Sequence, residues 1–252
     1  MAARGFVGAG DLYIARAVNG VFGPYEGPYE CTKLEIKPNI DRKELTSRGK
    51  NTYGQVIETV SLQKPADLKV ELPEINKQSL AIALLGTVAA LAQAAGSLVA
   101  ESLTAKLDAW AALTKAALIA PVLVKNAAAT TTYVEGVDYL INRELGWVKA
   151  IPGGAILNND VLKVSGAYAA ITGSEIRGAT QSDIRAKFKL DGKNQADGLP
   201  VIVTVHEAVI AADSAFDFLQ ADFATVSLPG RMKTPVGFTE PFTVHLRDAA
   251  VA

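Results

Sequence analysis

Hydrophobic and polar residues alternate strictly along several short stretches of the chain. In Asp67–Leu72, apolar side chains at positions 68, 70 and 72 alternate with charged ones at 67, 69 and 71. A period of two places the two kinds of side chain on opposite faces of a β-strand, one buried and the other in water. The same alternation predicts strands at Thr32–Lys37, Arg185–Leu190, Val201–His206 and Phe242–Arg247.

Weaker forms of the pattern add further predicted strands. They cover Leu12–Val18, Gln55–Leu62, Val161–Tyr168 and Phe223–Leu228. A chain of 252 residues with nine such strands is typical of a β-sandwich or a barrel. We therefore predict a mainly β protein that folds as a single domain over residues 1–252.

One segment has the spacing of a helix. Asn76 is a suitable N-cap and Gly96 a suitable stop. The apolar residues between them fall on one helical face, namely Leu80, Leu84, Val88 and Leu91. We predict a helix over 76–95 that flanks the β-structure. The uncharged stretch Ser79–Ala100 has the length of a membrane span, but it is mainly alanine, which drives insertion weakly. We therefore predict no membrane insertion.

The next segment, residues 98–130, has no single interpretation. Leu98–Ala120 is rich in alanine and leucine, which favours a helix. Pro121 and the run Val122–Val124 favour a strand instead. We treat this segment as an insertion whose structure is open.

A long polar segment separates the strands around Leu34 and Val56. Residues 41–53 show no apolar periodicity, and basic side chains outnumber acidic ones there. A connection of this length between paired strands is usually functional or disordered. We predict an extended loop whose candidate contact residues are Arg42, Lys43, Glu44, Arg48, Lys50 and Tyr53.

Composition excludes some classes of protein. Lys and Arg number 25 and Asp and Glu 26, which gives a net charge of -1. Such a chain has no basic excess for tight, sequence-independent binding to DNA, and little self-repulsion opposes its association. Cys31 is the single cysteine, so no intrachain disulfide forms, in keeping with folding in a reducing cytoplasm. The N-terminus lacks the apolar stretch of a signal peptide.

Motifs for catalysis or cofactor binding are not recognisable. The glycines of Arg4–Gly10 lack the preceding strand and following helix of a dinucleotide site. Asp191–Gly198 has Lys193 where a calcium loop needs an acid, so we predict a hairpin turn there. His206 and His245 are expected to be ordinary histidines on strands. We predict no enzymatic activity, no cofactor and no metal site.

A binding module, such as a carbohydrate-binding sandwich, is an alternative class. A module of that kind needs exposed aromatic side chains on one sheet. Trp110 and Trp147 are the available tryptophans, and the sequence does not place them in an aromatic row.

Several motifs in the C-terminal half resemble those of the tail tube (major tail) proteins of long-tailed, non-contractile bacteriophages. They are Leu190–Gly198, Phe216–Phe218, Asp222 with Phe223, and Leu228–Pro235. Three upstream segments resemble a strand–turn–strand pattern that is common in phage tail proteins, namely Thr131–Tyr139, Gly146–Val148 and Ile151–Ile156. The likeness covers most of the chain, and none of these motifs is catalytic.

The resemblance implies a β-sandwich subunit that forms hexameric rings, in which strands of six subunits join into one continuous β-barrel around a lumen. The segment 41–53 would reach the next ring. The implied partners are other copies of the chain, a tape-measure protein in the lumen, tail-tip and tail-terminator proteins, and DNA that passes without sequence-specific binding. The implied location is the virion, after assembly in the host cytoplasm. The alternative is the inner-tube protein of a contractile tail or a secretion machine.

Overall fold

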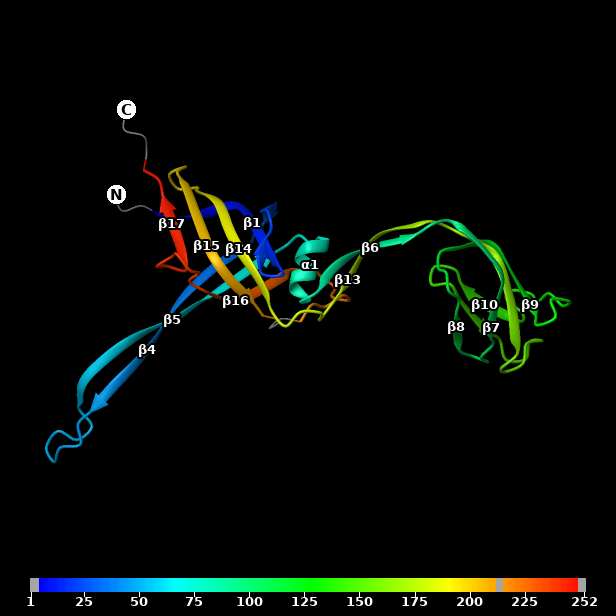
Figure 1. The fold of residues 1–252 in the computed structure, drawn as a ribbon, viewed down its shortest axis with the longest axis horizontal. Coiled ribbons are helices and arrows are strands. Elements are labelled where there is room, and N and C mark those ends of the chain that lie inside the picture. Colours follow the sequence, from blue (N-terminus) through cyan, green and yellow to red (C-terminus); the bar gives the residue numbers. More distant parts are fainter. Residues whose placement is uncertain (1–4, 212–214, 249–252) are drawn as a thin grey trace. The chain divides into compact units, whose positions relative to one another are not determined.

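A computed structural model describes residues 5–211 and 215–248 of the chain (Figure 1). The protein is mainly β-strand. It divides into two compact units, where the sequence predicted one domain. Unit 1 comprises residues 1–88 and 176–252, and unit 2 comprises residues 89–175. Each unit has a hydrophobic core of its own, which is the physical basis of the division.

Unit 1 is built on one antiparallel sheet. In the described part of the chain the strand order is β2-β1-β14-β15-β16-β5-β4, with β3 paired to β1 and β17 paired to β15. The strands are β1 Gly8–Val18, β2 Val21–Phe22, β3 Glu26–Glu30, β4 Lys33–Thr46, β5 Val56–Leu72, β14 Ile184–Asn194, β15 Pro200–Ile210, β16 Val226–Met232 and β17 Phe242–Leu246. The strands expected in this unit from period-two patterns are all present.

The sheet divides along β15. Its first half, Val201–Val205, pairs with β17, and its last residues, Ala208–Ile210, pair with β16. Side chains from both branches therefore meet in one core, which also receives residues of β1, β5 and β14. Leu12, Val70 and Leu228 are fully buried there. Each such side chain contributes about 1.5–3 kcal/mol relative to an exposed one.

The predicted helix over 76–95 is wrong in its second half. Helix α1 spans only Lys77–Ala83, and strand β6, Thr87–Gln93, follows it. Leu85 has a φ of 47°, and a Cβ on Gly86 would lie 2.5 Å from the carbonyl oxygen of Arg177, so the chain turns out of the helix here. β6 then pairs with β13, Ile171–Arg177, and this tertiary partner decides its conformation.

The buried face of α1 also differs from the predicted stripe. Ser79, Ala81 and Ile82 are buried, whereas Leu84 is only half-buried at the C-cap and Leu91 is exposed on β6. Within the described ranges, no helix is long and apolar enough to cross a membrane.

The predicted cap of this helix is confirmed. The side-chain oxygen of Asn76 accepts hydrogen bonds from the backbone N–H groups of Gln78 and Ser79, both at 2.9 Å. We expect Asn76→Ala to lower the free energy of unfolding by about 1 kcal/mol, because two N–H groups lose their partner. Chemical denaturation followed by circular dichroism measures this loss. Asn76→Ser preserves a capping oxygen and is the control, so an equal loss in both variants would contradict the role of the cap.

The segment 98–130, whose structure the sequence left undecided, consists largely of β-strands and belongs to unit 2. Among its described residues, two three-stranded sheets run in the orders β7-β12-β9 and β10-β11-β8. The strands are β7 Gly96–Thr104, β8 Trp110–Ala112, β9 Leu118–Asn126, β10 Tyr139–Asn142, β11 Trp147–Ala150 and β12 Val161–Tyr168. The helical interpretation of Leu98–Ala120 is thus wrong. Pro121 is compatible with β9 because β9 is at the end of its sheet's strand order.

Asp138 fixes two loops of unit 2. Its carboxylate accepts hydrogen bonds from the backbone N–H groups of Val134, at 2.8 Å, and Ala155, at 2.9 Å. These bonds favour the ionised form and lower the pKa of Asp138 below its ordinary value. The stability that they provide is therefore present above the unfolded-state pKa, about 3.9, and is lost as the pH falls through the folded-state pKa.

We expect Asp138→Asn to destabilise unit 2 by about 1–3 kcal/mol at pH 7, because the amide has only one acceptor oxygen for two N–H groups. The difference from the wild type should be smaller at pH 3, which lies below the unfolded-state pKa of about 3.9, because folding then requires the wild-type carboxylate to release a proton. Both tryptophans lie in unit 2, so denaturation followed by tryptophan fluorescence at the two pH values measures this difference. Glu144→Gln, at an exposed carboxylate of the same unit, is the control, and a pH-independent difference would refute the assignment.

Candidate functional site

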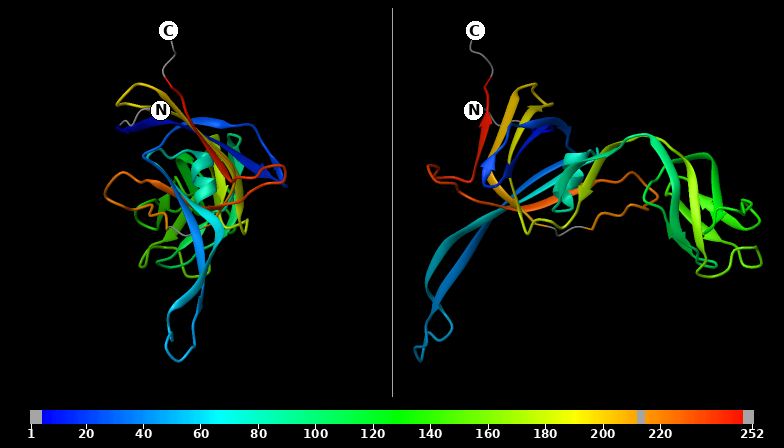
Figure 2. Two further views of the ribbon diagram at one scale, coloured as in Figure 1. Left: turned by 90° about the vertical axis from the view of Figure 1, so that its left-hand side faces the viewer. Right: turned by 45° about the vertical axis from the view of Figure 1, so that its right-hand side comes forward.

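Strands β4 and β5 continue past the core of unit 1 as a two-stranded hairpin, which we call the arm (residues 39–64). Figures 1 and 2 show it in blue and cyan, leaving the main sheet. Its strands pair from Asn39 with Lys64 to Thr46 with Val56. No side chain between these limits is buried, and the structure describes all of them. An isolated two-stranded hairpin is marginally stable in water, so the arm has the character of an element that another surface covers.

The predicted loop over 41–53 is therefore only partly a loop. Residues 41–46 belong to β4, and the turn occupies residues 47–55. The turn closes with hydrogen bonds from Ser47 N to Gln55 O, at 2.7 Å, and from Gly54 N to Ser47 O, at 2.9 Å. Neither face of the arm is buried in the chain itself, and residues 41–46 accordingly carry no period-two pattern. The strand predicted over Gln55–Leu62 from a weak pattern is present as the first part of β5.

One face of the arm carries three apolar side chains, which lie opposite the charged residues Asp41, Lys43 and Glu58. The cross-strand partners Lys43 with Val60 and Leu45 with Glu58 place Leu45, Val60 and Leu62 on the same face, because partners and every second residue share a face. We call this the apolar face of the arm. Leu45 is 59% exposed, Val60 48% and Leu62 47%. The tip adds exposed Tyr53 and Ile57.

The six candidate contact residues all lie on the arm but not on one face. Arg42 and Glu44 lie on the face opposite the apolar one, and Lys43 lies on the apolar face. Arg48, Lys50 and Tyr53 lie in the turn. Sequence reasoning missed Leu45, Val60 and Leu62 as contact residues. Val60 and Leu62 fall in the predicted strand Gln55–Leu62, and Leu45 in the predicted polar loop over 41–53.

A second surface is the outer face of β4, β5 and β16, which carries charges in complementary cross-strand pairs. Lys33 lies opposite Glu71, Glu35 opposite Lys69 and Lys37 opposite Asp67. Ion pairs join Lys33 to Glu35 at 2.8 Å, Lys69 to Glu71 at 2.7 Å and Arg231 to Asp67 at 3.5 Å. We call this the charged face.

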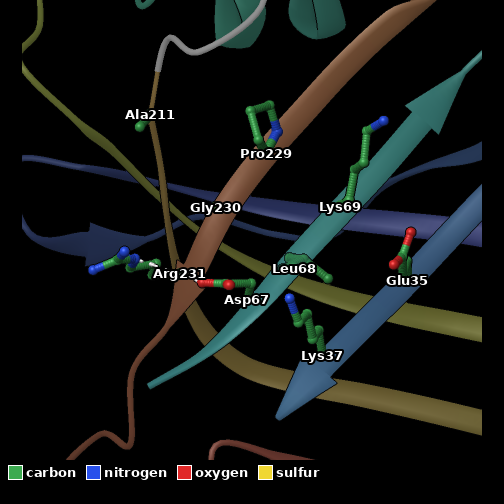
Figure 3. Close-up of a pocket in the computed structure, with 9 residues that line it drawn as sticks. All are labelled: Glu35, Lys37, Asp67, Leu68, Lys69, Ala211, Pro229, Gly230 and Arg231. Atoms are coloured by element: carbon green, nitrogen blue, oxygen red, sulfur yellow. Dashed lines mark ion pairs between the residues drawn. The ribbon is translucent and has the colours of Figure 1, made fainter. Parts of the chain in front are cut away.

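A hollow of about 380 Å3 lies on this face. Figure 3 shows the residues that line it, among them Lys37, Asp67 and Arg231. Lys33 lowers the pKa of the Glu35 carboxyl, and Glu35 raises the pKa of the Lys33 amine. Pairs this exposed contribute little to stability. Their effect is to make a hydrophilic surface on which positive and negative charges nearly cancel.

A third surface is the segment before β16. Phe216 packs partly against the core of unit 1 and meets Phe218 edge to face, with ring centroids 4.7 Å apart. Beyond it, Leu219 and Phe223 are almost fully exposed.

The two histidines and the buried Glu207, which could in principle take part in catalysis or metal binding, make contacts within the fold. His206 stacks on Phe238, with ring centroids 4.1 Å apart, and His245 is exposed on β17. Glu207 is buried but lies 3.4 Å from Lys233 and 3.6 Å from Arg185. Over the described ranges, no cluster of three His, Cys, Asp or Glu side chains is placed to hold a metal ion.

The hairpin turn predicted over Asp191–Gly198 is confirmed between β14 and β15. The buried Asn194 organises it, because its side-chain oxygen accepts from the backbone N–H groups of Val7, at 2.9 Å, and Ala196, at 3.2 Å. Its amide donates to the carbonyl of Gly5 at 3.0 Å. The side chain of Asn194 thus bonds to backbone groups of the turn and of the N-terminal segment.

The protein is thus mainly β-strand, with a projecting hairpin and exposed apolar side chains. Over residues 5–233 the chain matches the family described as "protein of unknown function UCP028589". This match covers most of the chain, and the protein belongs to that family. No curated protein matches the sequence.

Proposed function

We propose that the chain is a structural subunit of the tail tube of a long-tailed, non-contractile bacteriophage, which works by stacking in hexameric rings. The single observation that carries this proposal is the arm. It extends beyond the core with no buried side chain and with one apolar face, so covering it requires a surface that the subunit does not provide. In a tube that surface is on the next ring.

The strand order of unit 1 supports closure into a ring. β4 ends the path of the sheet and β17 branches from it at β15. Edge strands present backbone N–H and C=O groups that invite pairing with another chain, and pairing between neighbouring subunits removes those edges. In the proposed ring, such strands of six subunits join into one barrel.

The charged face is the surface best suited to the lumen. DNA that must slide through a tube should not meet unpaired Lys or Arg, because each neutralised phosphate adds affinity. On the charged face Lys33, Lys69 and Arg231 each lie beside a carboxylate. DNA and a tape-measure protein could then pass without strong retention. The proposed site of action is the virion, after assembly in the host cytoplasm with tail-tip and tail-terminator proteins.

The second candidate is the inner tube of a contractile tail or of a secretion machine. The same arm and sheet edges favour it, because such tubes also stack rings. Electron micrographs separate the two, since particles of the second kind carry a sheath around the tube.

We expect the purified chain to pass from monomers to rings and tubes as its concentration rises. Ring-to-ring contacts join different surfaces of the subunit, so they propagate without closing. Sedimentation velocity across concentrations and negative-stain micrographs measure this assembly. The control is a variant in which a short Gly-Ser turn replaces residues 42–62, and we expect it not to form tubes at any concentration. A wild-type chain that remains monomeric at every concentration would remove the proposal.

A further inference from the structure

Both tryptophans of the chain lie on one exposed face of unit 2. They come from β8 and β11, which are adjacent in the sheet β10-β11-β8. The register pairs Trp110 with Lys149 and Trp147 with Ala112. Trp110 and Trp147 are therefore diagonal neighbours on the same side of the sheet, roughly 7 to 8 Å apart at the backbone.

The opposite side of this sheet is the inner one. Val148, Ala150 and Tyr139 are buried in the core of unit 2. Because side chains alternate along a strand, this burial fixes Trp110, Trp147 and Lys149 on the outer side. Trp110 is 43% exposed and Trp147 38%. No aromatic row is visible in the sequence, because the two residues become neighbours only through the pairing of β8 with β11.

Polar groups accompany the two indole rings. The Lys149 amine lies 2.5 Å from a carboxylate oxygen of Asp108 and 6.0 Å from the centroid of the Trp110 ring. Asn142 lies across from Trp147 on β10. The register also places exposed Leu140 opposite Lys149, and the side-chain oxygen of Asn142 accepts from the backbone N–H of Leu145 at 3.1 Å, which leaves its NH2 group to donate. The outer face thus combines two partly exposed indole rings and a leucine with a neutral Asp–Lys pair and an amide donor.

We propose that this face, which we call the tryptophan face, binds a neutral polysaccharide built of pyranose rings. The flat side of a pyranose presents C–H bonds with slight positive charge, which suit the negative face of an indole ring. The hydroxyl groups around its edge can both donate and accept, which suits the Asp108 carboxylate, the Lys149 amine and the Asn142 amide. The ion pair contributes no net charge, so charge complementarity favours a ligand without charge.

A protein partner fits this face less well. An apolar protein surface laid over Trp110 and Trp147 would also cover the ion pair of Lys149 with Asp108, and desolvating such a pair costs more than its attraction returns unless new hydrogen bonds replace water. A sugar supplies those hydrogen bonds from the same ring that stacks on the indoles. The inference does not depend on tube formation.

Intrinsic tryptophan fluorescence reports on this face alone, because the chain has no other tryptophan. The test titrates the full chain with maltohexaose, cellohexaose and chitohexaose, and isothermal calorimetry repeats any titration that saturates. We expect a saturable spectral shift with at least one of the three. Trp110→Ala and Trp147→Ala should each weaken binding by about tenfold or more, which corresponds to ~1.4 kcal/mol.

Matched variants separate binding from folding. Trp110→Phe and Trp147→Phe retain an aromatic ring and should lose less affinity than the alanine variants. Val99→Ala, at an exposed apolar residue of the other sheet, should bind like the wild type. No shift with any of the three sugars, or an equal loss in Val99→Ala, would overturn the proposal. A shift that depends on protein concentration without sugar would also overturn it, because the face would then join copies of the chain.

Discussion

Replacing Leu45, Val60 and Leu62 together by serine should abolish tube formation while the subunit stays folded. These side chains form the apolar face of the arm, and each is about half exposed in the single chain. Substitutions at exposed positions usually change the free energy of unfolding by within about 0.5 kcal/mol. The same side chains would be buried between stacked rings, where losing apolar area weakens association. Negative-stain micrographs and sedimentation velocity measure assembly, and thermal unfolding measures stability.

The opposite face of the arm offers a matched control. Thr59 and Ser61 pair with Glu44 and Arg42 there. The double variant Thr59→Ala and Ser61→Ala should form tubes like the wild type. If it also blocks assembly, or if the serine variant forms normal tubes, the apolar face is not the contact.

Charge reversal tests the electrostatic part of the same contact. Arg42→Glu combined with Arg48→Glu should weaken assembly in a way that depends on salt, because exposed charges steer association and are screened. The serine variant should be insensitive to salt. This difference in salt dependence distinguishes the contribution of the basic residues, which were predicted from the sequence, from that of the apolar residues, which the structure identifies.

The second large effect concerns the core of unit 1. Phe188 is buried in the middle of β14, among residues of both branches of the sheet. We expect Phe188→Ala to cost about 3–5 kcal/mol of unfolding free energy, because the removed ring leaves a cavity that the two branches cannot fill. Chemical denaturation followed by far-ultraviolet circular dichroism measures the loss.

Unit 2 supplies the control for this measurement. Leu162 is buried in the core of unit 2, and both tryptophans report on that unit. Leu162→Ala should shift the tryptophan fluorescence transition, and Phe188→Ala should leave that transition near its wild-type position. A common shift of both signals in both variants would show that the two cores unfold together.

Some failures of sequence reasoning have one physical origin. The spacing of Leu80, Leu84, Val88 and Leu91 suits a helix, but Thr87–Gln93 pairs with β13, far along the chain. Propensity and spacing are local properties, and a strand partner supplied by the tertiary structure overrides them. The sequence predicts a loop over the first strand of the arm for a related reason, because residues 41–46 have no buried face that would impose a period-two pattern.

The sequence by itself determined the strands that line the core of unit 1. Burial on one face of a strand requires apolar and polar residues to alternate, and this alternation can be seen in the sequence alone. It is present at Leu68, Val70 and Leu72, around Phe188, and at Val203 and Val205. Only the tertiary structure decided what lies on the outside. Leu45 with Val60 and Leu62, Lys69 beside Glu71 and Glu35, and Trp110 diagonal to Trp147 are groupings set by strand register. Register depends on which strands pair, and pairing is a property of the folded chain that no single stretch of sequence contains.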